Sequence, residues 1–285
     1  MQAPDAWRES LAALFARTPE VALAFLFGSA ATRRMVEESD VDVAVYFYPE
    51  SGALDIENPD ATRPAAEERV WSEVEKITAR DVDLVVLNRA PATLACSVFE
   101  QGIPLVIKDP SLARRLGLIF SSVAEDFRAL TREFWDIKQR SRSLSEVDRD
   151  RLVRAVDFLE SELADSGLFQ DMTRQEYETD SSRRRNIERW VENIVNASID
   201  IAKIMLASRQ AQIPQTYRQV LQMLNTMPGM SPEIADALAG FSRLRNVLAH
   251  QYIDVRGSHI FRFLREATGA YAQLSAAARA FLKTP

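Results

Sequence analysis

The chain has 285 residues, of which 47% are hydrophobic and 27% are charged, and its formal net charge is −6 at pH 7. This composition is typical of a folded globular protein and excludes a disordered chain, while the length allows two domains of ordinary size. The negative net charge excludes attraction of nucleic acid to the whole surface, so contact with RNA has to come from a local basic patch.

Three sequence features bear on where the protein works. The chain has a single cysteine, Cys96, which excludes an intramolecular disulfide and fits a reducing cytoplasm. Cys96 lies in an apolar stretch, so we expect it in the core. No apolar run reaches the roughly 20 residues that a membrane-spanning helix needs. The N-terminal sequence MQAPDAWRES has no basic segment ahead of its apolar run, which argues against a signal peptide. We therefore expect a cytoplasmic protein that makes no membrane contact.

Helical and strand patterns alternate in the N-terminal half. Apolar residues at helical spacing predict helices, and short apolar runs bounded by glycine or acidic residues predict buried strands. The expected elements, in chain order, are a helix at 5–17, strands at 21–27 and 43–47, a helix at 65–79, a strand at 83–87, a helix at 91–102 and a strand at 103–109. This order predicts a small mixed α/β domain with flanking helices.

From Pro110 onward only helical patterns occur. The expected helices lie at 111–142, 148–166, 183–208, 215–226, 232–250 and 259–282. The polar segment at 140–150 is the best candidate for a boundary between domains. We therefore predict an α/β domain over residues 1–143 and an all-α helical bundle over residues 144–285.

Polar residues gather at the ends of the strands in the first domain. Gly28-Ser29 closes the first strand, Asp40 and Asp42 precede the second, and Asp83 opens the third. A Gly-Ser pair at the end of a strand frees backbone N–H groups and a hydroxyl to bind an anion. Two aspartates at i and i+2 of an extended chain point to the same side, where a cation such as Mg²⁺ relieves their repulsion. A nucleoside triphosphate is the usual partner that completes the shell of such an ion.

Each of these pieces also has a purely structural interpretation. Gly-Ser is a common turn, and an Asp-x-Asp pair can open a solvated strand. Asp83 decides between the two interpretations. A strand beside the first two would bring this third carboxylate to the same metal, as phosphoryl-transfer sites require.

The pattern G-S, ten residues, D-x-D, and then D opening the next strand resembles the minimal nucleotidyltransferases of the polymerase-beta-like superfamily. The resemblance covers most of the first predicted domain and implies ATP and Mg²⁺ as cofactors. It implies that Gly28 and Ser29 hold the triphosphate. Asp40 and Asp42 would bind Mg²⁺, and Asp83 would complete the metal site and activate the acceptor hydroxyl.

A second polar group closes the helix expected at 232–250. The sequence FSRLRNVLAHQYIDV places Arg245, Asn246, His250 and Tyr252 there. An arginine that binds phosphate and a histidine that moves a proton are the minimum for cutting RNA through its own 2′-OH without metal. Arg245 and His250 differ by about 140° around an ideal helix, so we expect them not to share one face. They could converge across a symmetric interface, where two copies of the helix end meet. Alternatively, His250 only favours the helix dipole and Arg245 only pairs with an acid.

The pattern R-N-x-x-x-H-Q-Y resembles the R-x-x-x-x-H-x-Y motif of the HEPN family. The similarity extends over roughly residues 148–265 and includes the P-x-x-Y-R run that begins at Pro214. In that family the domain is a helical homodimer, and active members are ribonucleases of the toxin type. A minimal nucleotidyltransferase antitoxin silences such a toxin by transferring AMP from ATP to the tyrosine of the motif.

Carried over to this chain, the resemblance assigns a role to each polar residue of the motif. It implies that Arg245 and His250 cleave RNA and that Asn246 is a positioning residue. It also implies that Tyr252 accepts AMP. The unusual feature is that both halves lie in one chain, which predicts a single-chain toxin–antitoxin protein whose first domain AMPylates the second and silences a metal-independent ribonuclease.

Two other functions compete with this prediction. One is a nucleotidyltransferase that modifies a small molecule such as an aminoglycoside, since these enzymes also join the catalytic domain to a helical one. It gives no reason for Arg245, His250 and Tyr252 to occur together. The other is a non-catalytic nucleotide-binding module, which rarely needs three convergent carboxylates.

Overall fold

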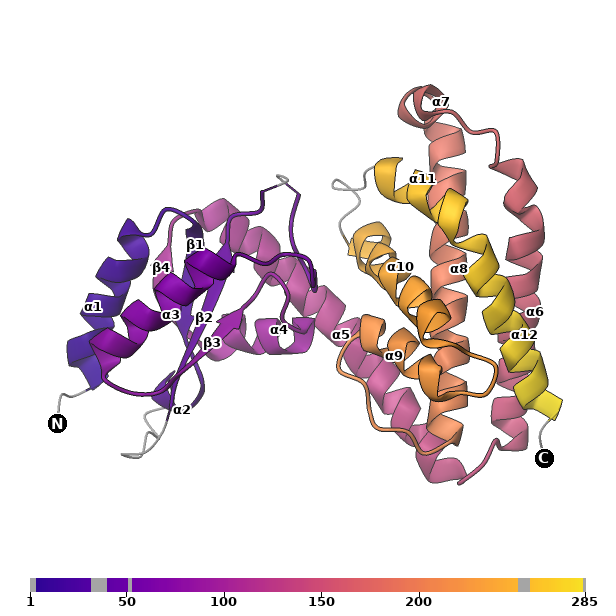
Figure 1. Cartoon of the computed structure of the whole chain (residues 1–285), viewed down its shortest axis with the longest axis horizontal. Helices are drawn as coiled ribbons and strands as arrows, with labels where there is room; N and C mark the ends of the chain where they lie inside the picture. The colour runs from indigo at the N-terminus through magenta and orange to yellow at the C-terminus, as the bar shows by residue number, and fades with distance from the viewer. Residues whose placement is uncertain (1–3, 32–39, 51–52, 251–256, 284–285) are drawn as a thin grey trace. The chain divides into compact units, whose positions relative to one another are not determined.

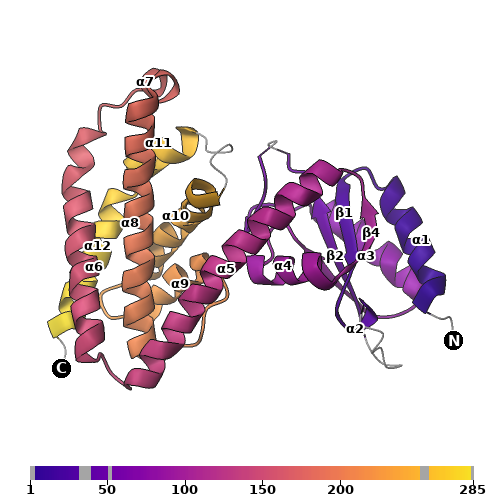
Figure 2. The same ribbon diagram turned by 180° about the vertical axis from the view of Figure 1, so that it is seen from behind.

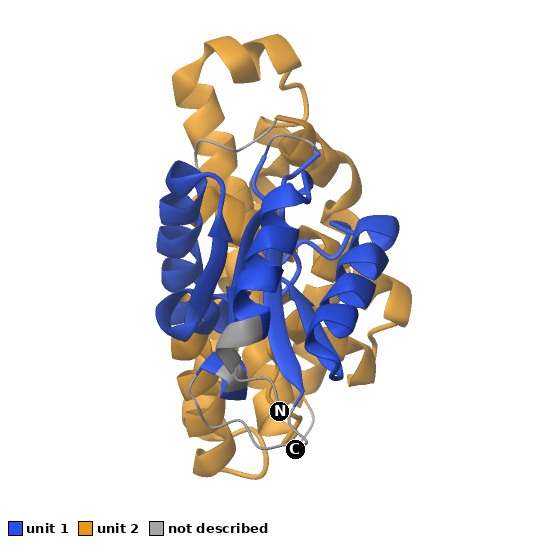
Figure 3. Cartoon of the chain, turned by 90° about the vertical axis from the view of Figure 1, so that its left-hand side faces the viewer, with its two compact units in different colours: residues 1–125 blue, residues 126–285 orange. Residues whose placement is uncertain are grey.

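The computed structural model describes residues 4–31, 40–50, 53–250 and 257–283 and divides the chain into two compact units (Figure 3). Unit 1 is Met1–Glu125 and unit 2 is Asp126–Pro285. The division falls inside one helix, α5 (Pro110–Arg140), whose first half packs in a core of unit 1 and whose second half packs in the core of unit 2. The domain boundary predicted between residues 143 and 144 stays a prediction.

Unit 1 is a mixed sheet of four strands in the order β3-β2-β1-β4 with flanking helices (Figure 1), which confirms the predicted α/β fold. The pairs β1–β2 and β1–β4 are antiparallel, and β2–β3 is parallel. Besides the first half of α5, its elements are α1 (Pro4–Arg17), β1 (Val21–Leu26), α2 (Gly28–Ala31), β2 (Val41–Phe47), α3 (Pro64–Thr78), β3 (Val82–Val86), α4 (Ala92–Gln101) and β4 (Ile103–Ile107).

Helices cover both faces of this sheet. Val43 and Val45 of β2 pack in one core with residues of α1 and α3, whereas Ala44 and Tyr46 pack in a second core with α4 and α5. Since side chains alternate along a strand, Asp42 shares the face of Ala44 and Tyr46. All six residues of β1 are buried, as expected for a strand covered on both sides. The predicted core position of Cys96 is confirmed, because this residue is 2% exposed in the second core.

Unit 2 is a helical bundle around one hydrophobic core, which confirms the predicted all-α half (Figures 1 and 2). Among the described residues, no helix is long and apolar enough to cross a membrane. The elements of unit 2 after α5 are α6 (Glu146–Ala164), η1 (Asp165–Leu168), α7 (Arg174–Thr179), α8 (Ser181–Ser208), α9 (Tyr217–Gln222), η2 (Met223–Thr226), α10 (Pro232–His250), α11 (Gly257–Glu266) and α12 (Thr268–Lys283).

Two helical details differ from the sequence-based expectation. The short helix α7 was not predicted, although Thr173 and Glu176 form the reciprocal hydrogen bonds of a capping box at its start. The helix expected at 259–282 is instead two helices that meet at Ala267. The break precedes Thr268 and Gly269, two residues with low helix propensity.

The polar segment between α5 and α6 forms a hydrogen-bonded connection. Ser145 caps α6 by accepting a hydrogen bond from the backbone N–H of Asp148 at 3.2 Å. The Asp148 carboxylate, 1% exposed, accepts hydrogen bonds from the Ser145 hydroxyl and from the Arg140 guanidinium at the end of α5. Polar composition here therefore reflects an internal network that fixes how the chain turns from α5 into α6.

Replacing Asp148 tests this network. Asp148→Ala leaves the Arg140 guanidinium and the Ser145 hydroxyl without their buried acceptor, so we expect the free energy of unfolding to fall by about 2 kcal/mol. Asp150→Ala is a matched control at an exposed position of the same helix and should change it by less than about 0.5 kcal/mol. Urea unfolding followed by circular dichroism measures both. Equal effects of the two variants would contradict the assignment.

Candidate active sites

In unit 1, the parallel pairing of β2 and β3 brings two of the predicted aspartates together. Asp42 and Asp83 are direct partners in the register of this pair. The backbone N–H of Val41 donates to the carbonyl of Asp81 at 2.9 Å and fixes the register where both strands begin. Asp42 is half-buried and Asp83 is exposed. The two residues are therefore neighbours at the end of the sheet where β2 and β3 begin.

Gly28 lies against the carboxylate of Asp42. Its φ angle is +64°, in the region that favours glycine, and a Cβ built on it would lie 2.1 Å from Asp42 Oδ2. Both conformation and space therefore require glycine here. The backbone N–H of Phe27 donates to the carbonyl of Asp42 at 3.0 Å, and the backbone of Ser29 hydrogen-bonds the Asp42 carboxylate. The predicted Gly-Ser turn and the predicted Asp-x-Asp pair thus meet in one site.

The electrostatics of this site favour a cation. Burial raises the pKa of Asp42, and the charges of Asp83 and Asp40 raise it further, against the hydrogen bond from the backbone of Ser29. A cation among these groups would relieve that repulsion, and carboxylate oxygens suit Mg²⁺. Within the described ranges, no group of three or more Asp, Glu, His or Cys side chains is assembled as a metal centre. The assignment of Asp40, Asp42 and Asp83 as metal ligands stays a prediction.

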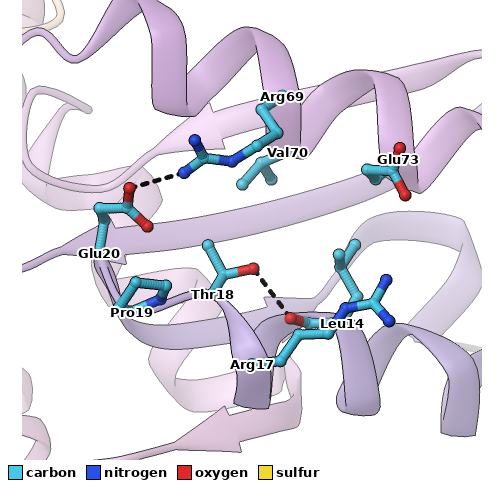
Figure 4. A pocket seen from close by; sticks show the side chains of 8 residues that line it. All are labelled: Leu14, Arg17, Thr18, Pro19, Glu20, Arg69, Val70 and Glu73. Carbon is cyan, nitrogen blue, oxygen red and sulfur yellow. Dashed lines mark hydrogen bonds and ion pairs between the residues drawn. The ribbon is translucent and has the colours of Figure 1, made fainter.

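A cavity of about 440 Å³ lies elsewhere in unit 1, between the end of α1 and α3, and contains none of the predicted site residues (Figure 4). Arg69 Nη2 lies 2.6 Å from Glu20 Oε1 there, and the Thr18 hydroxyl donates to the Leu14 carbonyl at 2.9 Å. The pKa of Glu20 is lowered, first by its own backbone hydrogen bond and then by Arg69.

In unit 2, the predicted pair of Arg245 and His250 converges within one chain. Arg245 Nη1 lies 3.2 Å from His250 Nε2 at the C-terminal end of α10. The expectation that these two residues do not share one face was therefore wrong for their side chains, and their convergence across a symmetric interface stays a prediction. The ideal azimuth places the Cα atoms apart, but the long arginine side chain reaches along the helix to a histidine in its last turn.

Asp126 of α5 is the third member of this group. Its Oδ2 atom lies 2.6 Å from Arg245 Nη2 and 2.9 Å from His250 Nε2. A histidine Nε2 either donates a proton or accepts one, and an anionic acceptor makes the stronger bond. The geometry therefore favours Nε2–H donating to Asp126. Burial acts to raise the pKa of Asp126, but the hydrogen bond and charge of Arg245, followed by those of His250, outweigh it and lower that pKa.

Aromatic side chains hold the arginine in place. The Arg245 guanidinium lies 4.6 Å from the centre of the Tyr217 ring, and the ring of Phe127 meets that of Tyr217 edge-on at 5.1 Å. Tyr217 begins α9 within the predicted P-x-x-Y-R run, and Phe127 follows Asp126 on α5. The three helices α5, α9 and α10 together fix the arginine.

Asn246 and Tyr252 are the other two residues of the predicted motif. Asn246 is 1% exposed, so it lies inside the bundle rather than beside solvent. Its predicted positioning role stays a prediction. Tyr252 lies outside the described residues.

Two family models match separate segments of the chain. Residues 9–111 match the model described as Polymerase beta, Nucleotidyltransferase. Residues 150–278 match the model described as Ribonuclease HepT-like. The chain joins a nucleotidyltransferase domain to a HepT-like domain. The predicted resemblances are confirmed at this level, with unit 1 containing the first match and unit 2 the second.

The two-domain chain is also similar to solved toxin–antitoxin structures. A crystal structure of a toxin–antitoxin with AMP-PNP is 23% identical, with a TM-score of 0.37, and the match covers 45% of this chain and 95% of the other. The tri-AMPylated Shewanella oneidensis HEPN toxin in complex with its MNT antitoxin is 21% identical, with a TM-score of 0.36, over 47% of this chain and 97% of the other. No curated protein matches the chain.

Sequence reasoning missed Asp126 in the site of the HepT-like unit. Val123 and Phe127 belong to the apolar stripe of α5 and are buried, and Asp126 lies at the border of that stripe. A carboxylate bordering a buried stripe needs a partner, which is the signal that could have found it. The identity of that partner depends on a contact 124 residues further along the chain.

The lowered pKa of Asp126 predicts a pH dependence of stability. Because the folded-state pKa lies below the unfolded value, near 3.8, this group stabilises the fold above that value and loses the contribution as the pH falls through the folded-state pKa. The carboxylate is part-exposed and solvent screens it, so we expect Asp126→Asn to cost about 1 kcal/mol at neutral pH and less at an acidic pH below the unfolded value. Unfolding in urea at both pH values measures this.

The control for that measurement is Asp136→Asn, which removes the same charge from an exposed position of α5. Its effect should be small and nearly independent of pH. A cost of Asp126→Asn that stays the same from neutral to acidic pH would contradict the ionic coupling of Asp126 to Arg245 and His250.

Proposed function

We propose that this chain is a single-chain toxin–antitoxin protein. Its nucleotidyltransferase domain transfers AMP from ATP to Tyr252, and this modification silences a metal-independent ribonuclease in the HepT-like domain. The observation that carries the proposal is the 3.2 Å distance between Arg245 Nη1 and His250 Nε2, and His250 lies two residues before Tyr252 in the sequence. The same chain has Gly28 packed against Asp42. A small-molecule nucleotidyltransferase would have no use for that arginine–histidine pair.

The nucleotide-binding half of the proposal assigns roles to five residues. Gly28 and Ser29 would hold the triphosphate, the serine through its hydroxyl. Asp40, Asp42 and Asp83 would hold Mg²⁺, and the raised pKa of Asp42 supports a cation there. The ion, when bound, would neutralise charge on the transferred phosphoryl group.

The transfer step itself is a displacement at phosphorus. The Tyr252 hydroxyl oxygen would form a bond to the α-phosphorus of ATP, and the bond from that phosphorus to the bridging oxygen of the β-phosphate would break. Pyrophosphate would leave, and Asp83 would take the hydroxyl proton. The exposure of Asp83 at the edge of the sheet is consistent with contact to an acceptor.

The ribonuclease half of the proposal uses the group at the end of α10. Arg245 would bind the scissile phosphate, and His250 would move a proton while the RNA 2′-OH attacks the phosphorus and the 5′-oxygen leaves. Asn246, which follows Arg245 in the sequence and is buried, would position the end of the helix. We further propose that the HepT-like domains of two chains pair as a homodimer and that the protein works in the cytoplasm.

AMP on Tyr252 would silence this site by charge and bulk. A phosphodiester adds negative charge two residues from His250 in the sequence, and negative charge repels an RNA backbone. Silencing therefore requires no rearrangement of Arg245 or His250.

Replacing Gly28 tests the nucleotide site. Gly28→Ala forces a Cβ into the position of the Asp42 carboxylate, so we expect AMP incorporation from labelled ATP to fall about 100-fold or more. Gly167→Ala is the matched control, because a Cβ there meets nothing within 4 Å, and it should retain nearly full incorporation. Equal rates for Gly28→Ala and the unaltered protein would exclude this site as the source of the activity.

Replacing Tyr252 tests the silencing step. Tyr252→Phe removes the acceptor oxygen, so we expect the variant to remain unmodified, to degrade RNA in vitro and to stop growth when it is expressed. Tyr252→Phe combined with His250→Ala should be harmless, which separates ribonuclease activity from misfolding. A Tyr252→Phe protein that folds, stays unmodified and leaves both RNA and growth unaffected would count against the scheme.

A further inference from the structure

Asp126 occupies the space between Arg245 and His250 of the candidate ribonuclease site. One oxygen atom, Oδ2, lies 2.6 Å from Arg245 Nη2 and 2.9 Å from His250 Nε2. These are the groups that would contact a scissile phosphate. A carboxylate and a phosphodiester are both anions that accept hydrogen bonds from guanidinium and imidazole N–H groups, so they compete for the same donors.

The guanidinium of Arg245 has little room for a second anion while Asp126 is bound. The Tyr217 ring covers one face at 4.6 Å, Nη1 lies beside His250, and Nη2 bonds Asp126. Bidentate binding of a phosphate uses two neighbouring N–H groups of the guanidinium. An RNA phosphate that approached the Nη1–Nη2 edge would therefore meet the Asp126 carboxylate already there.

The exposed fractions of the three side chains place Asp126 on the outside of the group. Its side chain is 36% exposed, compared with 17% for Arg245 and 15% for His250. The carboxylate is thus the most accessible member, and the Arg245 and His250 side chains lie deeper. A short side chain in this position can turn away from the site without disturbing the packing of Phe127 beside Tyr217.

We propose that Asp126 is an internal substitute for the RNA phosphate, which holds the Arg245–His250 site closed until RNA displaces it. Asp126 lies between the two matched segments, 9–111 and 150–278, so the closing group comes from the helix that joins the two domains. This inference rests on the proposed function for the identity of the displacing anion as RNA. It adds a second restraint on the ribonuclease that does not depend on AMP.

Binding of an uncleavable nucleic acid by the full chain tests the inference. The probe is a fluorescent single-stranded oligodeoxynucleotide, which lacks the 2′-OH needed for cleavage. Asp126→Asn keeps the shape of the side chain and removes its charge, and fluorescence anisotropy reports the affinity at fixed salt. Asp136→Asn removes an equal charge from an exposed position of α5 and controls for the change in net charge.

We expect Asp126→Asn to bind the probe about tenfold more tightly than the unaltered chain, because one contacting like charge is removed, whereas Asp136→Asn should change affinity less than about twofold. Adding Arg245→Ala to Asp126→Asn should abolish the gain. Asp126→Ser provides the same test if the asparagine variant does not fold. The inference would be overturned if Asp126→Asn bound the probe no more tightly than Asp136→Asn, or if neither variant bound it.

The two proposals fail in different ways. Tighter binding by Asp126→Asn without cleavage of RNA by any variant would keep the closed site and remove the ribonuclease from the proposed function. In the second case, Tyr252→Phe cleaves RNA, and adding Asp126→Asn slows that cleavage without tightening binding of the probe. This result would keep the ribonuclease in the proposed function. It would make Asp126 a positioning residue for His250 rather than a substitute for phosphate.

Discussion

Charge compensation is the constraint on which both sites of this chain depend. In unit 1 the parallel pairing of β2 with β3 sets Asp42 beside Asp83, and like charge together with burial raises the pKa of Asp42. In unit 2 the side chains of Arg245 and His250 share one carboxylate from another helix. The first arrangement favours an incoming cation, whereas the second already contains its counter-charge. On the proposed function, this difference separates a site that would gain a metal and a nucleotide from one that would have to lose a contact before it acts.

Short-range patterns predicted most of the fold. Apolar runs located all four strands of the sheet to within two residues at each end, because buried strands between covered faces leave long apolar segments. The helix expected at 232–250 has those bounds in the structure. The short helix α7 was missed although its capping box, T-R-Q-E, is visible in the sequence, since a helix of six residues has too few turns to show a periodic pattern.

The candidate sites were predictable where they depend on local spacing. Gly28, Asp42 and Asp83 were predicted from a turn, from the alternation of side chains along an extended chain and from the start of a strand. The structure brings these three residues together. Asp126 was not found, because its role arises from the packing of α5 against the end of α10. The convergence of Arg245 with His250 was judged from ideal azimuths, which describe where Cα atoms lie but not how far a long side chain reaches.

The most direct test of the central claim is the mass of the intact protein, with peptide mapping, as purified and after incubation with ATP and Mg²⁺. The control is the Asp40→Ala/Asp42→Ala double variant, expressed and treated in parallel. The account predicts AMP on the peptide that contains Tyr252 in the unaltered chain and none in the control. An unaltered chain that carries no AMP in either state would contradict it and would point to a diffusible acceptor for the nucleotidyltransferase domain.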